Sequence, residues 1–312
     1  MIFREGRTGD LEGIVRLLNL CFGTYRRWGL DEERYLAWVE HDPGFGWEGV
    51  LVAEERGEIV GHLNVLPREL SLSGCWVRIA GIANVAVHPG QRRRGVARGL
   101  MVHALDRVRA PLAGLFAGFG EAAYALYRSL GFLPLFFTRY AVVAREMVWG
   151  SRGGASVRRA SEADSPVLQS LYKKQAHSWD GMARRDEGHF RERVFRSCAT
   201  HTFFRASSRA EVLIEESGRG YAVIWPRTEE VPPGMGVVGE MVWEDEETCV
   251  SLLLATFERM DVSGLKVFAP SFPPRVGAEW FRTPEVLMLK PLDPSGELEL
   301  RAQRYVFPAD RW

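Results

Sequence analysis

Apolar runs and amphipathic stretches alternate along the first half of the chain. The strand-like runs are 2–4, 49–53, 59–66, 79–87, 112–116 and the stretch from 132 onward. The first long pair is separated by a charged, turn-forming segment, which is typical of a β-hairpin. Apolar residues recur at helical spacing over 96–108 and 121–130. This order predicts an α+β fold with helices flanking a mixed, mostly antiparallel sheet.

The start of the pattern recurs after the midpoint at one constant offset. The residues that align are Arg4 with Arg158, Asp10 with Asp164, Ile14 with Leu168, and Leu17 with Leu171. In both copies a short strand precedes an aspartate at the start of an amphipathic helix. We interpret the match as a repeated unit, with chance agreement as the alternative. The glycine-rich stretch 149–156 is typical of a linker, so we expect domains at 1–148 and 157–312.

Composition bounds the function. A chain of 312 residues corresponds to about two domains, and its formal net charge is zero. We therefore expect no general attraction to nucleic acid or to an anionic membrane. Early charges argue against a signal peptide, and no apolar run approaches the length of a membrane span. The cysteines at 21, 75, 198 and 249 are far apart, so we expect a cytoplasmic protein without disulfides or metal.

The candidate chemistry lies where the predicted strand 79–87 turns into the predicted helix 96–108. Unpaired backbone N–H groups and the positive end of the helix dipole make a helix start a phosphate-binding place. Nearby arginines add charge-assisted hydrogen bonds. The residues expected to form this cofactor site are Val85, Ala86, Val87, Arg92, Arg93, Arg94, Gly95, Val96 and Ala97. A solvated arginine run and a basic nucleic-acid loop are the alternatives, the latter without interleaved aromatic residues to favour it.

A second motif follows, and the two together resemble the GNAT superfamily of N-acetyltransferases. The family's pyrophosphate loop has the form Q/R-x-x-G-x-G/A, which Arg92, Gly95 and Ala97 match. Its next helix commonly reads N-x-x-A-x-x-L-Y-x-x-x-G-F. The matching residues are Ala123, Leu126, Tyr127, Gly131 and Phe132, with Gly120 in place of the asparagine. The resemblance implies that acetyl-CoA is the cosubstrate.

A narrower resemblance covers the chain through about residue 292. The run 85–95, the spacing of Tyr127 and Gly131, and the segment 239–242 before a helix are similar to the Eis-type acetyltransferases. Those proteins have a GNAT domain, a degenerate GNAT domain and a C-terminal sterol-carrier-like domain. The resemblance implies two tandem GNAT-like domains, the second degenerate, without the third. In that family the C-terminal carboxylate reaches the active site, and the sequence leaves open whether that of Trp312 does so.

The second half is expected to lack its own cofactor site. Its predicted strand, 237–242, leads into Glu244, Asp245, Glu246 and Glu247 before the predicted helix 249–260. Where the first half presents arginines and a glycine, this segment presents carboxylates, which would repel a pyrophosphate. We therefore expect the second half to act as a scaffold and as a wall of the substrate site.

Acyl transfer to an amine needs a proton donor for the departing thiolate. The resemblance implies Tyr127 in this role, with a backbone N–H near Val87 facing the negative charge that develops on oxygen. A tyrosine packed in the core without a chemical role is the alternative. Tyr124, one turn earlier, is a second tyrosine able to substitute for it.

A proton acceptor is also needed, because a primary amine with a pKa of about 10.4 is mostly protonated near pH 7. Many relatives carry glutamate at the strand position occupied here by Ala83. His62, Glu121 and His88 are candidate bases, and deprotonation through water is equally compatible with the sequence.

The sequence thus predicts an N-acetyltransferase that moves an acetyl group from acetyl-CoA to a primary amine by direct attack in a ternary complex. The alternatives are a non-catalytic acyl-CoA sensor and an interaction scaffold without a ligand. The sequence does not distinguish aminoglycoside, polyamine, amino acid, peptide N-terminus or protein lysine as acceptor. It also leaves the oligomeric state and the acyl-chain preference open.

Overall fold

The structure is a computed structural model that describes residues 1–40, 42, 44–149, 155–186, 188–196, 210–226, 231–292 and 304–305. The strands of the first half are β1 (Ile2–Glu5), β2 (Val50–Glu55), β3 (Glu58–Leu72), β4 (Cys75–Val87), β5 (Leu112–Gly118) and β6 (Leu133–Ala144). Its helices are α1 (Leu11–Cys21), α2 (Gly23–Trp28), α3 (Glu32–Glu40), α4 (Val96–Arg107) and α5 (Ala122–Ser129).

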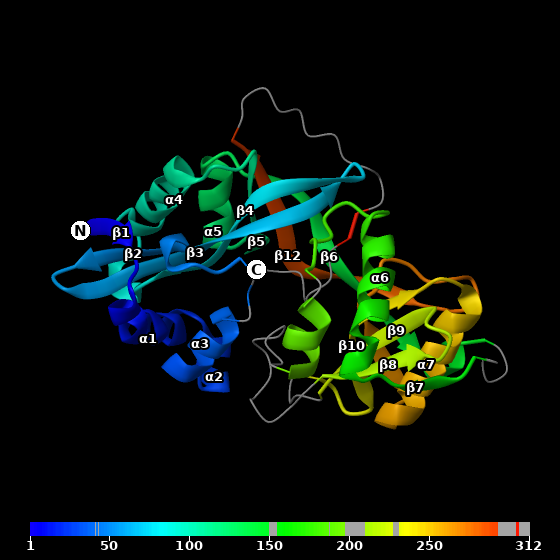
Figure 1. The fold of residues 1–312 in the computed structure, drawn as a ribbon. Helices are drawn as coiled ribbons and strands as arrows, with labels where there is room; N and C mark the ends of the chain where they lie inside the picture. Colours follow the sequence, from blue (N-terminus) through cyan, green and yellow to red (C-terminus); the bar gives the residue numbers. More distant parts are fainter. Residues whose placement is uncertain are drawn as a thin grey trace.

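The second half repeats the mixture of strands and helices. Its strands are β7 (Val157–Arg159), β8 (Glu211–Glu215), β9 (Gly220–Trp225), β10 (Met235–Trp243), β11 (Gly264–Val267) and β12 (Glu279–Pro291). Its helices are α6 (Ser165–Ala176), the π-helix His189–Arg196 and α7 (Glu246–Met260). The strands of both halves form one sheet in the order β1-β2-β3-β4-β5-β12-β6-β11-β10-β9-β8-β7, with one group of helices at each end (Figure 1).

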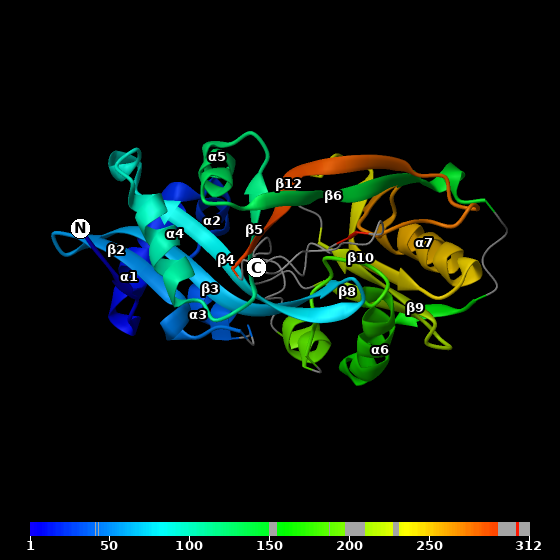
Figure 2. The same cartoon turned by 90° about the horizontal axis from the view of Figure 1, so that it is seen from above.

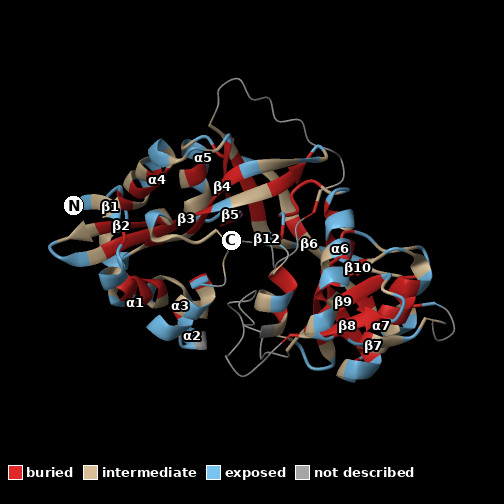
Figure 3. Cartoon of the chain, viewed as in Figure 1, coloured by how far each residue is buried: buried red, intermediate tan, exposed pale blue. Residues whose placement is uncertain are grey.

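The predicted elements of the first half are confirmed, and several are longer than the sequence pattern indicated. The hairpin turn between β2 and β3 has positive φ at both Arg56 and Gly57, the geometry of the two-residue turn that suits the twist of antiparallel strands. β3 and β4 extend well beyond the predicted runs and form a long ribbon. Buried residues are concentrated in the strands, whereas the helices carry many of the exposed residues (Figure 3).

The two halves exchange their last strands. β12 comes from the second half but lies between β5 and β6, and β6 pairs in turn with β11 of the second half (Figure 2). The residues Val286, Leu287, Met288 and Leu289 at the centre of β12 are between 0 and 1% exposed. The predicted linker falls between β6 and β7, and its residues 150–154 lie outside the described part. The domain boundary remains a prediction, because strand pairing crosses it.

The β3–β4 ribbon provides a second connection. Its tip reaches the second half, where the Ser71 N–H donates to the Met182 carbonyl at 2.9 Å and the Gly181 N–H donates to the Ser71 carbonyl at 2.8 Å. The Asp180 carboxylate accepts from the Ser73 N–H at 2.8 Å. The ribbon thereby spans the space between the two groups of helices.

The aligned residues of the two halves make the same local structure. Arg4 donates two hydrogen bonds to Asp10 at 2.7 and 2.8 Å, and Arg158 donates two to Asp164 at 3.0 and 2.7 Å. Each aspartate also accepts from a backbone N–H three residues earlier, at 2.8 and 2.7 Å respectively. The alignment found in the sequence therefore has a structural basis in how each half begins its first helix.

Candidate functional site

The site begins where β4 separates from β5. The two strands pair in parallel only from Ile79 to Gly81, opposite Leu112 to Gly114. Beyond Gly81, β4 continues beside β3 alone, while β5 continues beside β12. Beyond Gly81 the edge of β4 that faced β5 therefore has no strand partner, although the Val87 carbonyl accepts from Cys21 Sγ at 3.2 Å. We call the space between β4 and β5 beyond Gly81 the gap.

A bulge in β4 coincides with this separation. The register between β3 and β4 shifts between His62 and Asn64, and Asn84 has a φ of 55°, a left-handed conformation that asparagine tolerates better than most residues. The His88 N–H donates to the Val60 carbonyl on β3 at 2.9 Å. Because successive residues of a strand alternate in direction, the Val87 N–H points away from β3 and toward the gap.

The segment after β4 makes an open helix start. A short turn, Pro89–Gln91, is followed by Arg92, Arg93, Arg94 and Gly95, and α4 then begins at Val96. Gly95 is the N-cap with a φ of 80°, and no atom lies within 4 Å of where its Cβ would be. No side chain caps the first turn of α4, so no capping side chain uses its first N–H groups, as a bound phosphate requires.

The three arginines differ in their partners. Arg94 donates to Gln91 and lies 3.3 Å from the carboxylate of Glu55. Arg92 makes a long contact of 3.5 Å to the Val87 carbonyl. Arg92 and Arg93 are exposed, and neither forms an ion pair within the described ranges. Two cations are thus available beside the open helix start, while the third is already neutralised.

Tyr127 lies on α5, over the same face of the sheet as α4. Its side chain is 5% exposed and packs edge-on against Phe132, with ring centroids 6.1 Å apart. Burial, with a smaller contribution from the charge of Glu121, raises the pKa of the Tyr127 hydroxyl to about 12. Tyr124 instead packs against Phe119, with ring centroids 5.1 Å apart. Gly120 has a φ of 81°, which explains how glycine serves where relatives have asparagine.

The candidate bases occupy different surroundings. His88 is exposed, and its Nδ1 accepts from the Gly90 N–H at 3.1 Å, so it caps the turn. Glu121 is exposed at the start of α5, and its carboxylate lies over Gly118. His62 is fully buried, and burial lowers its pKa to about 4, which keeps the ring neutral at pH 7.

A row of buried polar groups lies beside the β4 bulge, and of its members only His62 was singled out from the sequence. The Tyr25 hydroxyl donates to Asn84 Oδ1 at 2.7 Å. Within the part of the chain that the structure describes, Asn84 Nδ2, Asn64 Oδ1 and His62 Nε2 have no hydrogen-bond partner. Burial raises the pKa of the nearby Tyr35 hydroxyl, and a contact with the Asn64 side chain partly offsets that rise. Buried polar atoms without protein partners indicate places for water or for a ligand. The signal was hidden because these residues come from α2, α3, β3 and β4, which the sequence does not place together.

The corresponding region of the second half is closed. β10 also has a register shift, between Val238 and Glu240, but a Cβ on Gly239 would lie 1.7 Å from Trp225 Nε1. The first turn of α7 is capped by Asp245, whose carboxylate accepts from the Thr248 N–H at 2.9 Å. Trp225 thus fills the place beside the bulge, and a carboxylate already occupies the helix start.

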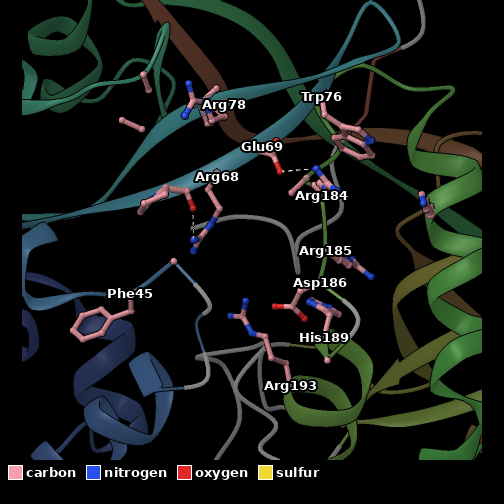
Figure 4. Close-up of a pocket in the computed structure, with 18 of the residues that line it drawn as sticks. Phe45, Arg68, Glu69, Trp76, Arg78, Arg184, Arg185, Asp186, His189 and Arg193 are labelled. Atoms are coloured by element: carbon pink, nitrogen blue, oxygen red, sulfur yellow. Dashed lines mark hydrogen bonds and ion pairs between the residues drawn. The ribbon is translucent and has the colours of Figure 1, made fainter.

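A large cavity lies between the two halves under the β3–β4 ribbon (Figure 4). Its volume is about 1480 Å³, and it is lined by β3, β4 and loops of the first half together with α6 and residues 183–193 of the second. It reaches β4 at Ile79 and Ala80, directly before the point where β4 leaves β5. Neither the Arg92–Ala97 loop nor Tyr127 lines it.

The structure also bears on the cysteines, the C-terminus, membrane spans and metal sites considered from the sequence. Cys21, Cys75 and Cys249 are free thiols, while Cys198 and the Trp312 carboxylate lie outside the described residues. In the described ranges no helix is long and apolar enough to cross a membrane. No group of three His, Cys, Asp or Glu side chains there is arranged to hold a metal ion.

Comparison with known families finds a match within the first half. Residues 3–134 match the sequence model of the family described as Acetyltransferase (GNAT) domain. No curated protein sequence matches the chain.

Solved structures extend the similarity over both halves. A GCN5-related N-acetyltransferase from Anabaena variabilis aligns with a TM-score of 0.72 at 16% identity, covering 94% of this chain and 73% of that one. Eis1 from Mycobacterium abscessus aligns with a TM-score of 0.63 at 17% identity, covering 94% and 74%. A putative acetyltransferase from Pyrococcus horikoshii aligns with a TM-score of 0.56 at 15% identity, covering 100% and 95%. The predicted fold of two tandem GNAT-like units is confirmed.

Proposed function

We propose that this chain, whose residues 3–134 belong to the GNAT acetyltransferases, transfers an acetyl group from acetyl-CoA to a primary amine by direct attack in a ternary complex. One observation carries the proposal: β4 loses β5 after Gly81 and then runs directly into the open helix start at Gly95. A strand edge without a strand partner and an uncapped helix start thus belong to one continuous segment.

The chain's own groups suit the cosubstrate, which supplies the reactive thioester when bound. The N–H groups of Gly95, Val96 and Ala97, with the Arg92 and Arg93 side chains, would hold its phosphates. The edge of β4 at Val85 to Val87, which has no strand partner beyond Gly81, would hold its amide-containing arm as an added strand does. The Val87 N–H would face the carbonyl oxygen on which negative charge develops.

Tyr127 is proposed as the donor that returns a proton to the sulfur. A tyrosine with a pKa of about 12 is a weak acid toward a thiolate whose conjugate acid has a pKa of about 8.5 in water. A thiolate released into the same buried space is itself desolvated, which raises the pKa of that thiol. We therefore propose that Tyr127 donates as the carbon–sulfur bond breaks, not afterwards.

The proton of the attacking amine is proposed to leave through water. The β4 position at which relatives carry glutamate is Ala83, 5% exposed. The unpartnered groups of Asn64 and Asn84 beside the bulge would orient a water there. His62 stays neutral and can accept a hydrogen bond, but its depressed pKa makes it a poor base at pH 7.

The acceptor is proposed to enter from the cavity between the halves, with the second half serving as its wall. The cavity ends at Ile79 and Ala80, next to the gap in which the thioester would lie. One cosubstrate per chain is proposed, because Trp225 and Asp245 occupy the corresponding places in the second half. A cytoplasmic location is proposed, since acetyl-CoA is an intracellular metabolite.

A second candidate function is a sensor that binds acyl-CoA without turnover. The observation that favours it is the lack of a carboxylate at Ala83, together with the burial of Tyr127. Release of free CoA thiol from acetyl-CoA, measured against a panel of amines, separates the two functions. Amine-dependent thiol release well above the amine-free rate supports transfer. Tight acetyl-CoA binding without release for any amine supports the sensor.

A further inference from the structure

The cavity between the halves has an unusual charge. Of its lining residues, eight are arginine or lysine and three are aspartate or glutamate, although the whole chain has a formal net charge of zero. Cationic side chains are therefore concentrated here. A cleft lined by one sign of charge raises the local concentration of ligands of the opposite sign.

Several of these cations already have partners. The Asp42 carboxylate lies 2.5 Å from Arg68 and 4.0 Å from Arg193, and it thereby joins β3 to the second half. Although burial opposes this, the two arginines lower the pKa of Asp42. Arg184 pairs with Glu69 at 3.0 Å (Figure 4). Two further cations of the lining are also paired, Arg185 with Glu240 at 2.5 Å and Arg191 with Glu162 at 3.5 Å.

Three lining cations have no acidic partner in the described ranges: Arg78 on β4, Arg109 after α4, and Lys173 on α6. All three are exposed, and they come from both halves. Glu48 and Asp186 are the lining carboxylates without an ion pair in those ranges. An amine with several positive charges needs a cluster of carboxylates, which this lining does not offer.

The distance from Arg78 to the gap and the volume of the cavity restrict the size of the ligand. Arg78 lies three residues before Gly81, at which β4 leaves β5, so roughly 10 Å of strand separates its Cα from the gap. That separation exceeds the distance between the amine and carboxylate of one amino acid and matches about three extended residues. The cavity of about 1480 Å³ is also larger than the roughly 300–1,000 Å³ of typical small-molecule pockets.

We propose that the acceptor is the N-terminal amine of an acidic peptide. The amine reaches the gap between β4 and β5, and carboxylates of the following residues contact Arg78, Arg109 and Lys173. Trp76 and Phe45, which line the cavity, supply apolar walls for the peptide. This assignment of substrate class rests on the proposed acetyl transfer, whereas the binding of acidic peptide does not.

Direct binding tests the proposal with the full chain. Peptides Ala-Glu-Glu-Glu, Ala-Gln-Gln-Gln and Ala-Lys-Lys-Lys, each labelled at the C-terminal end, are titrated and followed by fluorescence anisotropy. We expect the glutamate peptide to bind at least about 10-fold more tightly than the other two, and binding to weaken as salt rises. Arg78→Gln and Lys173→Gln should each weaken it about 10-fold. Lys174→Gln is the matched control, because Lys174 pairs with Glu244 at 2.6 Å and does not line the cavity.

Turnover with unlabelled peptides tests the proposed acetyl transfer separately from the binding of an acidic peptide. Thiol release with the glutamate peptide, abolished when its N-terminus is acetylated beforehand, supports both. Binding without thiol release for any amine refutes the acetyl transfer and retains the peptide site. Thiol release with the lysine peptide or a polyamine but not with the glutamate peptide refutes the acidic acceptor. Equal activity with free glutamate refutes the requirement for a peptide, and unchanged binding in both cavity variants refutes the site.

Discussion

At the scale of single residues, Tyr127 both packs in the core and is proposed to donate a proton. Tyr127→Phe keeps the ring against Phe132 and removes only the hydroxyl. We expect kcat to fall roughly 10²-fold or more, because general acids contribute about 10²–10⁴-fold. The acetyl-CoA dissociation constant should stay nearly unchanged, since the interaction is lost in the transition state. Steady-state kinetics and calorimetry measure the two quantities.

Tyr124→Phe is the control for this experiment, because the two tyrosines lie one turn apart on α5 and Tyr124 packs against Phe119. If Tyr127→Phe keeps a near wild-type kcat and Tyr124→Phe loses it, Tyr124 is the proton donor and the assignment to Tyr127 is wrong. Full activity in both would mean that solvent protonates the thiolate. With a pKa of about 12, Tyr127 should remain protonated and cause no loss of kcat between pH 8 and 10.

His62 makes a prediction about stability at low pH. Its folded pKa of about 4 lies below the unfolded value of about 6.5, so the unfolded chain binds this proton first on acidification. The free energy of unfolding should therefore fall by about 3 kcal/mol as the pH drops from 6.5 to 4. His62→Asn should remove this part of the loss, as measured by urea denaturation at several pH values. An equally steep fall in His62→Asn would show that other groups cause it.

At the scale of elements, the sequence predicted the strand and the helix on either side of the Arg92–Ala97 loop. The apolar runs around 79–87 and 112–116 and the arginine-rich turn between strand and helix are local signals, and local signals are what a sequence shows directly. The separation of β4 from β5 and the position of Asn84 at the bulge depend on how the strands pair, which a local pattern does not show. The polar row at Tyr25 and Asn64 likewise depends on which elements become neighbours.

The exchange of β6 and β12 likewise could not be predicted from local sequence patterns. The run 286–289 is recognisably apolar, but nothing in it says that its neighbours are β5 and β6 of the first half. A strand's partners are set by long-range packing. A domain boundary drawn at the linker, although compatible with the composition, therefore cuts through one sheet.

This exchange predicts how a fragment behaves. A chain ending at residue 148 lacks β12, so β5 and β6 each lose the strand that pairs with one of their edges. We expect this fragment to be unfolded or aggregated and unable to bind acetyl-CoA. Adding a synthetic peptide of residues 279–292 should restore binding, which circular dichroism and calorimetry detect, whereas a scrambled peptide should not. A fragment that folds and binds alone would contradict the structural role of β12.

At the scale of the whole molecule, the shared sheet, the β3–β4 ribbon and the Asp42 ion pairs tie both halves together. Urea unfolding should therefore give one transition, with coincident curves from far-ultraviolet circular dichroism and tryptophan fluorescence. Two separated transitions would mean that the halves unfold independently despite the exchanged strands.

The central claim is that one acetyl-CoA binds per chain, at the open start of α4. Isothermal titration of acetyl-CoA into the wild-type protein, Gly95→Gln and Gly95→Glu tests it most directly. Both variants place a side chain at a φ of 80°, so their difference isolates the charge facing the phosphates. We predict one site per chain in the wild type, weakened binding in Gly95→Gln and none detectable in Gly95→Glu, with both variants folded. Two equivalent sites, or equal binding in the Gln and Glu variants, would contradict the account.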